Sequence, residues 1–329
     1  MNVADGTYNE CNISIGNSGT SSSPITFQSI NKWGAKLVSP VGCDTDIKVN
    51  GSWIVLKQLD ISGGGTPGPG ADGGAHGVFL SGGTNHILFN NRIHNIGNIF
   101  STTTNAMAGI FVQTANDIID SNVLFMIGRT SGNAGGRVCC SNDHSMYIDG
   151  ALGATATTIQ NNLTYQDIGG WAIQVYPGSM TNMLVINNTM DMTGAGGNGA
   201  NPPIGCILQG TNMSNSRFAN NLCINPAGGV MFHTGANGDS ASNVLIDHNL
   251  TTVSSMVQVN NTYTIDSSNI FNANANSIFV SLSGNDYNLV SGSPAMGSGS
   301  SNGAPPLDIL GTARPQSGRF DAGAYEFTH

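Results

Sequence analysis

Four side chains capable of acid–base chemistry gather in one short segment: Asp143, His144, Tyr147 and Asp149. Cleavage of a uronate-containing glycan by β-elimination needs a base for the proton beside the carboxyl group, an acid for the leaving oxygen and a cation for the carboxylate. His144 and Tyr147 can supply the first two roles, since an unperturbed histidine has a pKa of about 6.5, and Arg137 can supply the third. The segment therefore predicts a site of the lyase type.

Hydrolysis of a glycan requires a different set of groups, namely two carboxylates. Asp143 and Asp149 are the candidate pair, with Asp72 as a substitute. A third interpretation involves no chemistry, because the same side chains can be surface groups that loops cover. The sequence does not decide between lyase and hydrolase.

Side chains that suit a sugar ring accompany the acid–base groups: Trp171, Tyr176, Gln174, His76, Gln113 and Asp72. A sugar needs an apolar face to stack on and directional partners for its hydroxyls, which aromatic rings, amides and carboxylates provide. We expect Trp171 and Tyr176 to face outward, and we assign this set to substrate binding.

A recurring Asn indicates the elements that position these residues. It follows an Asn, Ser or His and precedes one variable and one apolar or β-branched residue, at Asn91, Asn122, Asn162, Asn188, Asn221 and Asn249, with gaps of 31, 40, 26, 33 and 28 residues. Such a period is typical of stacked supersecondary units. Asn amides stacked at one corner can satisfy one another as a ladder. The repeat predicts an all-β fold, a parallel β-helix with an internal Asn ladder.

A second repeat lies upstream of each Asn and alternates with period two, which predicts a strand with one buried face. Its buried positions are expected to form one core column of Val78, Ile110, Met146, Ile173, Cys206 and Val230. Its outward positions are expected to be Phe79, Phe111, Tyr147, Gln174, Ile207 and Met231, followed two residues later by Ser81, Gln113, Asp149, Tyr176, Gln209 and His233.

Insertions at 63–75, 98–107, 129–143 and 193–203 all precede this strand. Loops that leave consecutive coils at one corner build the walls of a groove, and long loops on a compact scaffold are usually functional. The candidate residues lie on the strands that would form the groove floor. The continuous repeats also predict one domain over 1–329, with first coils at 1–62, central coils at 63–252 and last coils with a closing segment at 253–329.

Both ends of the chain resemble right-handed parallel β-helix proteins of the pectate-lyase-like superfamily. The opening stretch VADGTY at 3–8 with SPITFQS at 23–29 is similar to their first coil, and GSPA at 292–295 with DAGAYEF at 321–327 is similar to their closing segment. The resemblance implies the right-handed fold and an extracellular, polysaccharide-acting protein. The superfamily holds lyases, hydrolases, epimerases and non-catalytic adhesins. Its members usually carry a helix that caps the first coil, and we expect that this helix was trimmed here.

Cysteine usage favours an oxidising compartment. The repeat places Cys206 and Cys223 in neighbouring strands of one coil and Cys11 and Cys43 in the first coils, where disulfides would staple the solenoid. Cys139-Cys140 forms a vicinal pair in a long loop. The even count of six Cys predicts a secreted or cell-surface protein.

Net charge and hydropathy limit the classes of binding partner that the protein can have. The net charge is −9 with only ten Lys and Arg, which argues against nucleic acid because phosphate binding needs a basic face. No run is long and apolar enough for a transmembrane helix. We expect a monomer whose partner is a polysaccharide, with no certain cofactor and with room for a calcium ion. The alternative to an enzyme is a carbohydrate-binding or adhesin β-helix.

Overall fold

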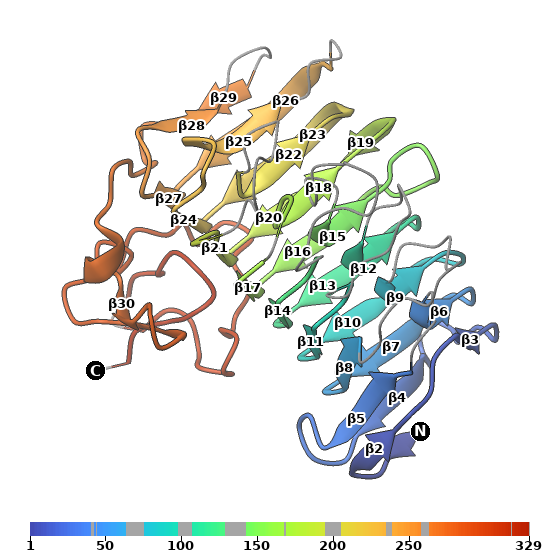
Figure 1. Cartoon of the computed structure of the whole chain (residues 1–329). Coiled ribbons are helices and arrows are strands. Elements are labelled where there is room, and N and C mark those ends of the chain that lie inside the picture. The colour runs from blue at the N-terminus through green and yellow to red at the C-terminus, as the bar shows by residue number, and fades with distance from the viewer. Residues whose placement is uncertain are drawn as a thin grey trace, which may run out of the picture.

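Successive strands of the chain point in three directions in turn, so that the chain winds into a stack of coils (Figure 1). The computed structural model describes residues 1–40, 43, 45–63, 76–97, 107–128, 143–167, 169–194, 205–234, 239–257, 263–316 and 318–328. All statements below concern these residues. The coils contribute strands to three parallel sheets, here named A, B and C, which confirms the predicted fold; in one coil sheet A receives two strands, β19 and β20.

The sheets contain the following strands. Sheet A holds β1 (Asn2–Val3), β4 (Ile25–Ser29), β7 (Ile54–Lys57), β10 (Ile87–Phe89), β13 (Ile118–Asp120), β16 (Thr158–Gln160), β19 (Ser179–Thr181), β20 (Leu184–Ile186), β23 (Asn212–Ala219), β26 (Ala241–Asp247) and β29 (Tyr263–Ile265). Sheet B holds β2 (Gly6–Tyr8), β5 (Ala35–Ser39), β8 (Asp60–Gly63), β11 (Arg92–His94), β14 (Val123–Phe125), β17 (Leu163–Tyr165), β21 (Thr189–Asp191), β24 (Leu222–Ile224) and β27 (Leu250–Thr251). Sheet C holds β3 (Ile13–Ile15), β6 (Thr45–Val49), β9 (His76–Leu80), β12 (Ala108–Val112), β15 (His144–Ile148), β18 (Ile173–Val175), β22 (Ile207–Gln209), β25 (Val230–Thr234) and β28 (Ser255–Val257).

The predicted Asn ladder runs along the corner between sheets A and B. Its members are fully or almost fully buried and comprise Asn91, Asn122, Asn162, Asn188, Asn221, Asn249 and, beyond the prediction, Asn269. At a typical rung, the Asn122 side-chain oxygen accepts from the backbone N–H of Asn91 at 2.9 Å and from its side-chain amide at 3.0 Å. The amide of Asn122 in turn donates to the carbonyl of Leu88. Each coil is thereby tied to the next through buried amides.

The residue before each ladder Asn has a second structural role. It adopts positive φ at Asn90, Ser121, Asn161, Asn187, Asn220 and His248, the region that Asn tolerates better than most side chains. Three of these amides reach the C-terminal segment: Asn161 donates to the carbonyl of Leu307, Asn187 to Asp321 and Asn220 to Ser300. In these Asn pairs the second amide therefore points into the solenoid core, and the first points away from the core toward the C-terminal segment.

The C-terminal segment that follows β29 and Asn269 folds back along the solenoid, and in Figure 1 it lies beside the ends of β17, β21, β24 and β27. It contains the short 3₁₀-helix η1 (Ala275–Ser277) and the antiparallel pair β30 (Phe279–Ser281) and β31 (Asp286–Leu289). Its apolar side chains, among them Phe279 and Tyr287, pack on Leu163 and Leu222 from the outer face of sheet B. No described helix has the length and apolar character needed to cross a membrane.

The predicted core column is correct in its first four members and wrong in its last two. Val78, Ile110, Met146 and Ile173 are register partners, but Ile173 pairs with Ile207 instead of Cys206, and Ile207 pairs with Phe232 instead of Val230. A slip of one residue reverses which side chains face out. The expected outward positions Ile207 and Met231 are accordingly buried.

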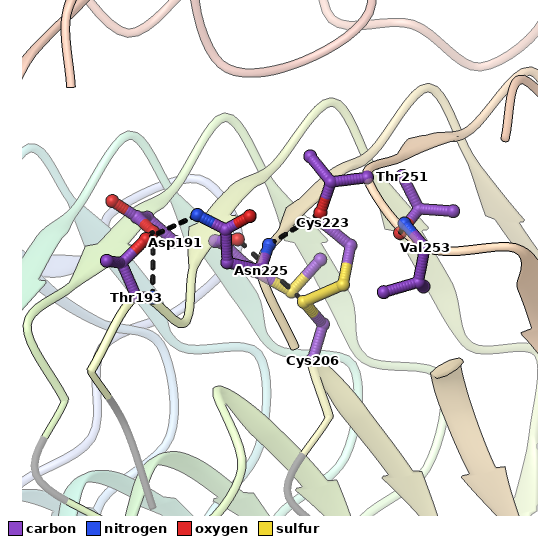
Figure 2. Close-up of a disulfide and its surroundings, with 9 residues drawn as sticks. Asp191, Thr193, Cys206, Cys223, Asn225, Thr251 and Val253 are labelled. Carbon is purple, nitrogen blue, oxygen red and sulfur yellow. Dashed lines mark hydrogen bonds between the residues drawn. A yellow bond between two sulfur atoms is a disulfide. The ribbon is translucent and has the colours of Figure 1, made fainter. Parts of the chain in front are cut away.

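Both disulfides that the sequence predicted are formed. Cys11 bonds Cys43, and Cys206 bonds Cys223, with Cα atoms 6.0 and 5.9 Å apart. Figure 2 shows the second bridge between Cys206, just before β22, and Cys223 on β24, next to the polar side chains of Asp191, Thr193 and Asn225. The vicinal pair Cys139-Cys140 lies outside the described residues.

Candidate functional site

A continuous column of side chains crosses the outer face of sheet C. The strand register places side by side Lys48, Phe79, Phe111, Tyr147, Gln174, Leu208 and His233. Parallel strands are about 4.8 Å apart, so seven positions span roughly 29 Å. We call this set the sheet C column. Phe79, Phe111, Tyr147 and Gln174 are as predicted. Lys48 was not expected, and Leu208 and His233 take the places expected for Ile207 and Met231.

The N-terminal half of the sheet C column is aromatic. Phe79 and Phe111 stack with ring centroids 4.7 Å apart, and Phe111 meets Tyr147 edge-on at 5.1 Å. The Lys48 ammonium lies 5.3 Å from the Phe79 ring centroid. All three rings are only partly buried. They therefore offer a flat, accessible apolar surface next to the polar groups that follow.

A local departure from strand alternation brings two histidines to this face. Gly77 and Gly109 face the core, since a Cβ at these positions would lie 2.8 Å from a side-chain carbon of Ile93 or Leu124, respectively. The next residue of each strand, Val78 or Ile110, is also in the core. Two consecutive inward positions break the period of two. The preceding residue then faces out, which places His76 beside Phe79 and Phe111, with centroids 5.7 and 5.0 Å apart.

Tyr147 is the centre of the polar part of the column. Its strand partner in the next coil is Gln174, whose side chain is hydrogen-bonded to the phenol, and the Asp149 carboxylate is near enough to affect the pKa of Tyr147. Burial raises the pKa of Tyr147 to about 12, and the neighbouring Asp149 adds to this effect. The phenol therefore keeps its proton at neutral pH and can donate it to an oxygen atom.

Asp149 follows β15 and is held in a turn. Its Oδ1 accepts the backbone N–H groups of Ala151 and Leu152 at 3.0 and 3.1 Å. Burial raises the pKa of Asp149, against the lowering effect of these two hydrogen bonds. A carboxylate with a raised pKa is a stronger base than one in water, so this group can accept a proton next to Tyr147.

His144 is placed near Tyr147 but its expected role as a base needs correction. Its ring stacks on Tyr147 with centroids 5.6 Å apart, and it is only 1% exposed. Nδ1 accepts the backbone N–H of Trp171 at 3.1 Å, which leaves the proton on Nε2, a buried atom without a hydrogen-bond partner. Because burial lowers the pKa of His144 to about 3, the ring is neutral and presents a donor.

The expected exposure of Trp171 is wrong. Its side chain is 1% exposed and fills the space over Gly205, where a Cβ would lie 2.7 Å from the indole Cζ3. The ring continues to His233, with centroids 5.3 Å apart. Trp171 occupies the outward position next to His144. Because residue 205 in the neighbouring coil is a glycine, the indole can lie against the sheet there. Trp171 is therefore a packing residue on this face.

The two carboxylates of the proposed hydrolytic pair stand at opposite ends of β15, since Asp143 precedes the strand and Asp149 follows it. At about 3.3 Å per residue, their backbones are roughly 15–20 Å apart. Glycosidases place their two carboxyl groups about 5–10 Å apart. Asp143 is buried and its Oδ1 accepts the backbone N–H of Met107 at 3.2 Å. The two side chains do not form one catalytic pair.

The remaining predicted residues are distributed along the same face. Gln113 and Tyr176 continue the row of Asp149, and Tyr176 is 36% exposed. Gly210 makes room for its ring, because a Cβ there would lie 2.5 Å from Tyr176 Cδ2. Arg137 and Asp72 lie outside the described residues, as do most residues of the four predicted insertions.

Sequence reasoning missed Lys48, Leu208 and His233 as members of the column. The signal for Lys48 was present, because its strand has the same alternation as the later coils. The other two were misplaced by the register slip. Within the described ranges, no three His, Cys, Asp or Glu side chains lie close enough together to hold a metal ion. The calcium ion stays a prediction.

Comparison with solved structures identifies the fold. A structure described as pectate lyase Pel9A matches 99% of this chain and 87% of its own, with a TM-score of 0.54 at 13% sequence identity. The chain has the fold of the pectate-lyase-like β-helix proteins. An alginate lyase from Paenibacillus sp. str. FPU-7 matches 81% of this β-helix and 91% of its own chain, with a TM-score of 0.49 at 12% identity. A pectin methylesterase from Aspergillus niger covers 80% of it, with a TM-score of 0.37 at 10% identity over 75% of its own chain.

Comparisons of this β-helix with models of protein families and with curated proteins find no match. Sequence identities of this size show the fold alone. The arrangement of side chains on sheet C must therefore carry any statement about function.

Proposed function

We propose that this β-helix is an extracellular protein that binds a polysaccharide along the sheet C column and cleaves it by β-elimination. The observation that carries the proposal is the placement of Tyr147 and Gln174, with Asp149 and Tyr176 in the next row of the same face, at the end of the Phe79–Phe111 stack. Sugar rings would stack on the aromatic half, and the amide and phenol groups would bind hydroxyls. The two disulfides support an oxidising, extracellular location.

In this proposal Asp149 is the base and Tyr147 the acid. The Asp149 carboxylate takes the proton beside the uronate carboxyl group, and the electron pair of that C–H bond forms the new double bond. The bond to the glycosidic oxygen breaks, and the Tyr147 phenol gives its proton to this oxygen. Transfer of the proton from Asp149 to Tyr147 then restores both groups. His144 stays neutral and packs its ring against Tyr147 from the buried side.

The test is a panel of uronate-containing and neutral polysaccharides, read by absorbance of unsaturated products and by new reducing ends. Tyr147→Phe and Asp149→Asn should each lower turnover by about 10² or more. Lys57→Ala, on the outer face of sheet A, is the control and should leave turnover unchanged. If Tyr147→Phe keeps full activity on a cleaved substrate, the assignment of the acid is wrong.

One observation favours a second function, binding without cleavage. The pKa of His144 lies far below neutrality and that of Tyr147 far above it, so neither group titrates near neutral pH. A carbohydrate-binding β-helix would need only the aromatic and amide groups. Retention of a polysaccharide with no product in either readout, together with loss of retention in Phe111→Ala, would establish this alternative.

A further inference from the structure

A cavity of about 460 Å³ lies away from the sheet C column, where the C-terminal segment meets sheet B. Its walls come from the ends of β17 and β21 on the solenoid and from η1, β30 and the turn to β31 on the C-terminal segment. Pockets for small ligands typically measure about 300–1,000 Å³. This cavity is therefore large enough for one or two sugar-sized units.

The lining of the cavity is rich in uncharged polar groups: Gln166, Thr193, Asn276, Ser281, Ser283 and Asn285. Amides and hydroxyls can both donate and accept hydrogen bonds, which matches the dual capacity of a ligand hydroxyl. An apolar strip completes the wall, and its Val280 is 55% exposed. A large exposed valine beside a ring of amides gives the mixed surface that one face of a sugar ring requires.

The charge of the cavity disfavours anionic ligands. Asp191 is its charged lining residue, and no Lys or Arg is among the described lining residues. The carboxylate is fixed in place, because Oδ1 accepts the Thr193 hydroxyl at 2.5 Å and Oδ2 accepts the Tyr287 phenol at 2.7 Å. The Thr193 hydroxyl also accepts from the Asn225 side-chain amide at 2.9 Å, and Figure 2 shows the three side chains near one another. A ligand carboxylate or phosphate would meet a negative charge without a compensating cation.

The two walls are joined by specific contacts, so the cavity is formed before a ligand enters. The rings of Tyr165 and Tyr287 have centroids 5.5 Å apart, and Gln166 donates to the Asn285 side chain at 3.4 Å. The hairpin itself packs through Phe279, whose ring meets Tyr287 edge-on at 5.2 Å. A preformed site avoids much of the ordering cost of binding.

We propose that this cavity is a second binding site, which takes a neutral saccharide and is separate from the sheet C column. It rests on the cavity, its amide and hydroxyl lining and the fixed carboxylate of Asp191, and it does not require that the protein cleaves glycans. Ligands of this class are short neutral oligosaccharides, since acidic sugars are disfavoured by the same carboxylate.

The experiment measures binding of neutral disaccharides and trisaccharides of glucose, mannose, galactose and xylose, and of a galacturonate disaccharide, by saturation-transfer NMR and calorimetry. Ser283→Trp replaces a small lining residue of the cavity by a large one, and Gln166→Ala removes one donor. Asn288→Ala, on β31 and outside the cavity, is the matched control. Tyr147→Phe and Phe111→Ala report on the sheet C column. Circular dichroism and thermal melting of each variant confirm that it is folded.

We expect a neutral saccharide to bind to the parent protein with a Kd of about 1 mM or below. The affinity should fall at least tenfold in Ser283→Trp. The two column variants and Asn288→Ala should bind the saccharide as tightly as the parent does. The proposal is overturned if no neutral saccharide binds at this level or if the galacturonate disaccharide binds more tightly. It is also overturned if binding survives Ser283→Trp but is lost in Phe111→Ala. Loss of cleavage in Tyr147→Phe bears only on the proposed function.

Discussion

Replacing one rung of the Asn ladder should destabilise the solenoid by an amount that depends on the number of buried donors left without an acceptor. The side-chain oxygen of Asn162 accepts two donors, the backbone N–H of Asn122 at 2.9 Å and its side-chain amide at 3.1 Å. The oxygen of Asn91, the first rung, accepts only the backbone N–H of Leu59 among the described residues. Asn162→Ala therefore orphans two buried donors and Asn91→Ala one.

An orphaned buried donor costs about 1–3 kcal/mol. The free energy of unfolding should fall by that amount in Asn91→Ala and by about twice as much in Asn162→Ala. Each amide also donates to one backbone carbonyl of the preceding coil and to the next Asn, and the amide of Asn162 donates in addition to the carbonyl of Gln160. This extra hydrogen bond adds to the larger cost expected for Asn162→Ala. Both side chains are 0% exposed, so the difference in cost does not come from burial.

Urea denaturation followed by far-UV circular dichroism measures the two changes, with the slope of the transition compared among the variants to check that unfolding stays cooperative. Asn288→Ala, an exposed residue of β31, serves as the surface control and should change stability by less than about 0.5 kcal/mol. Equal costs for the two ladder variants, or a cost for Asn162→Ala no larger than that of the control, would refute the counting of donors.

Three further predictions concern other parts of the fold. Cys206→Ser with Cys223→Ser should lower the free energy of unfolding by about 3 kcal/mol, since the bridge closes a loop of 17 residues, and intact mass should show two hydrogens fewer per bridge in the parent under non-reducing conditions. Asn187→Ala removes donors to the carbonyls of Asp321 and Gly323, so limited proteolysis should cut the C-terminal segment faster, and unchanged cleavage would contradict its anchoring role. Burial raises the pKa of Asp167 to about 8 from 3.8, so the native state binds the proton more tightly than the unfolded state and stability should fall as pH rises from about 4 to 8. Asp167→Asn should flatten that slope in a series of thermal melts, and a parallel slope in both proteins would show that another group causes it.

The ladder and the first strands of sheet C could be predicted from the sequence because they repeat without exception. Asn122, Asn162 and Asn188 hold equivalent corners, and no apolar residue can replace their amides there. The register at Cys206 could not be predicted, because Cys206 and Ile207 are both apolar and either one satisfies the alternation. Only the pairing of Ile207 with Ile173 decides between them.

The candidate site was less predictable for a related reason. The strand register places Tyr147 beside Gln174, with Tyr176 two residues after Gln174, as the repeat predicts. The exposure of Trp171 was predicted wrongly, because it depends on the absence of a side chain at Gly205 in the neighbouring coil. The protonation of His144 depends on a backbone N–H that only the folded coil presents. Contacts between coils are not encoded in the pattern within one coil.

The anchoring of the C-terminal segment limits how this protein could change its length. Asn161, Asn187 and Asn220, on three consecutive coils, each bind a fixed carbonyl of that segment. Inserting or deleting one coil between them would shift an anchor by a strand spacing, about 4.8 Å, and remove it from its carbonyl. In the described coils before Asn161, the side chains of the equivalent residues Asn90 and Ser121 make no hydrogen bond to the described part of the C-terminal segment; the Ser121 hydroxyl donates to Asp120 instead. Duplication of a coil during evolution should therefore be tolerated in the N-terminal part of the stack and not among the coils that the C-terminal segment covers.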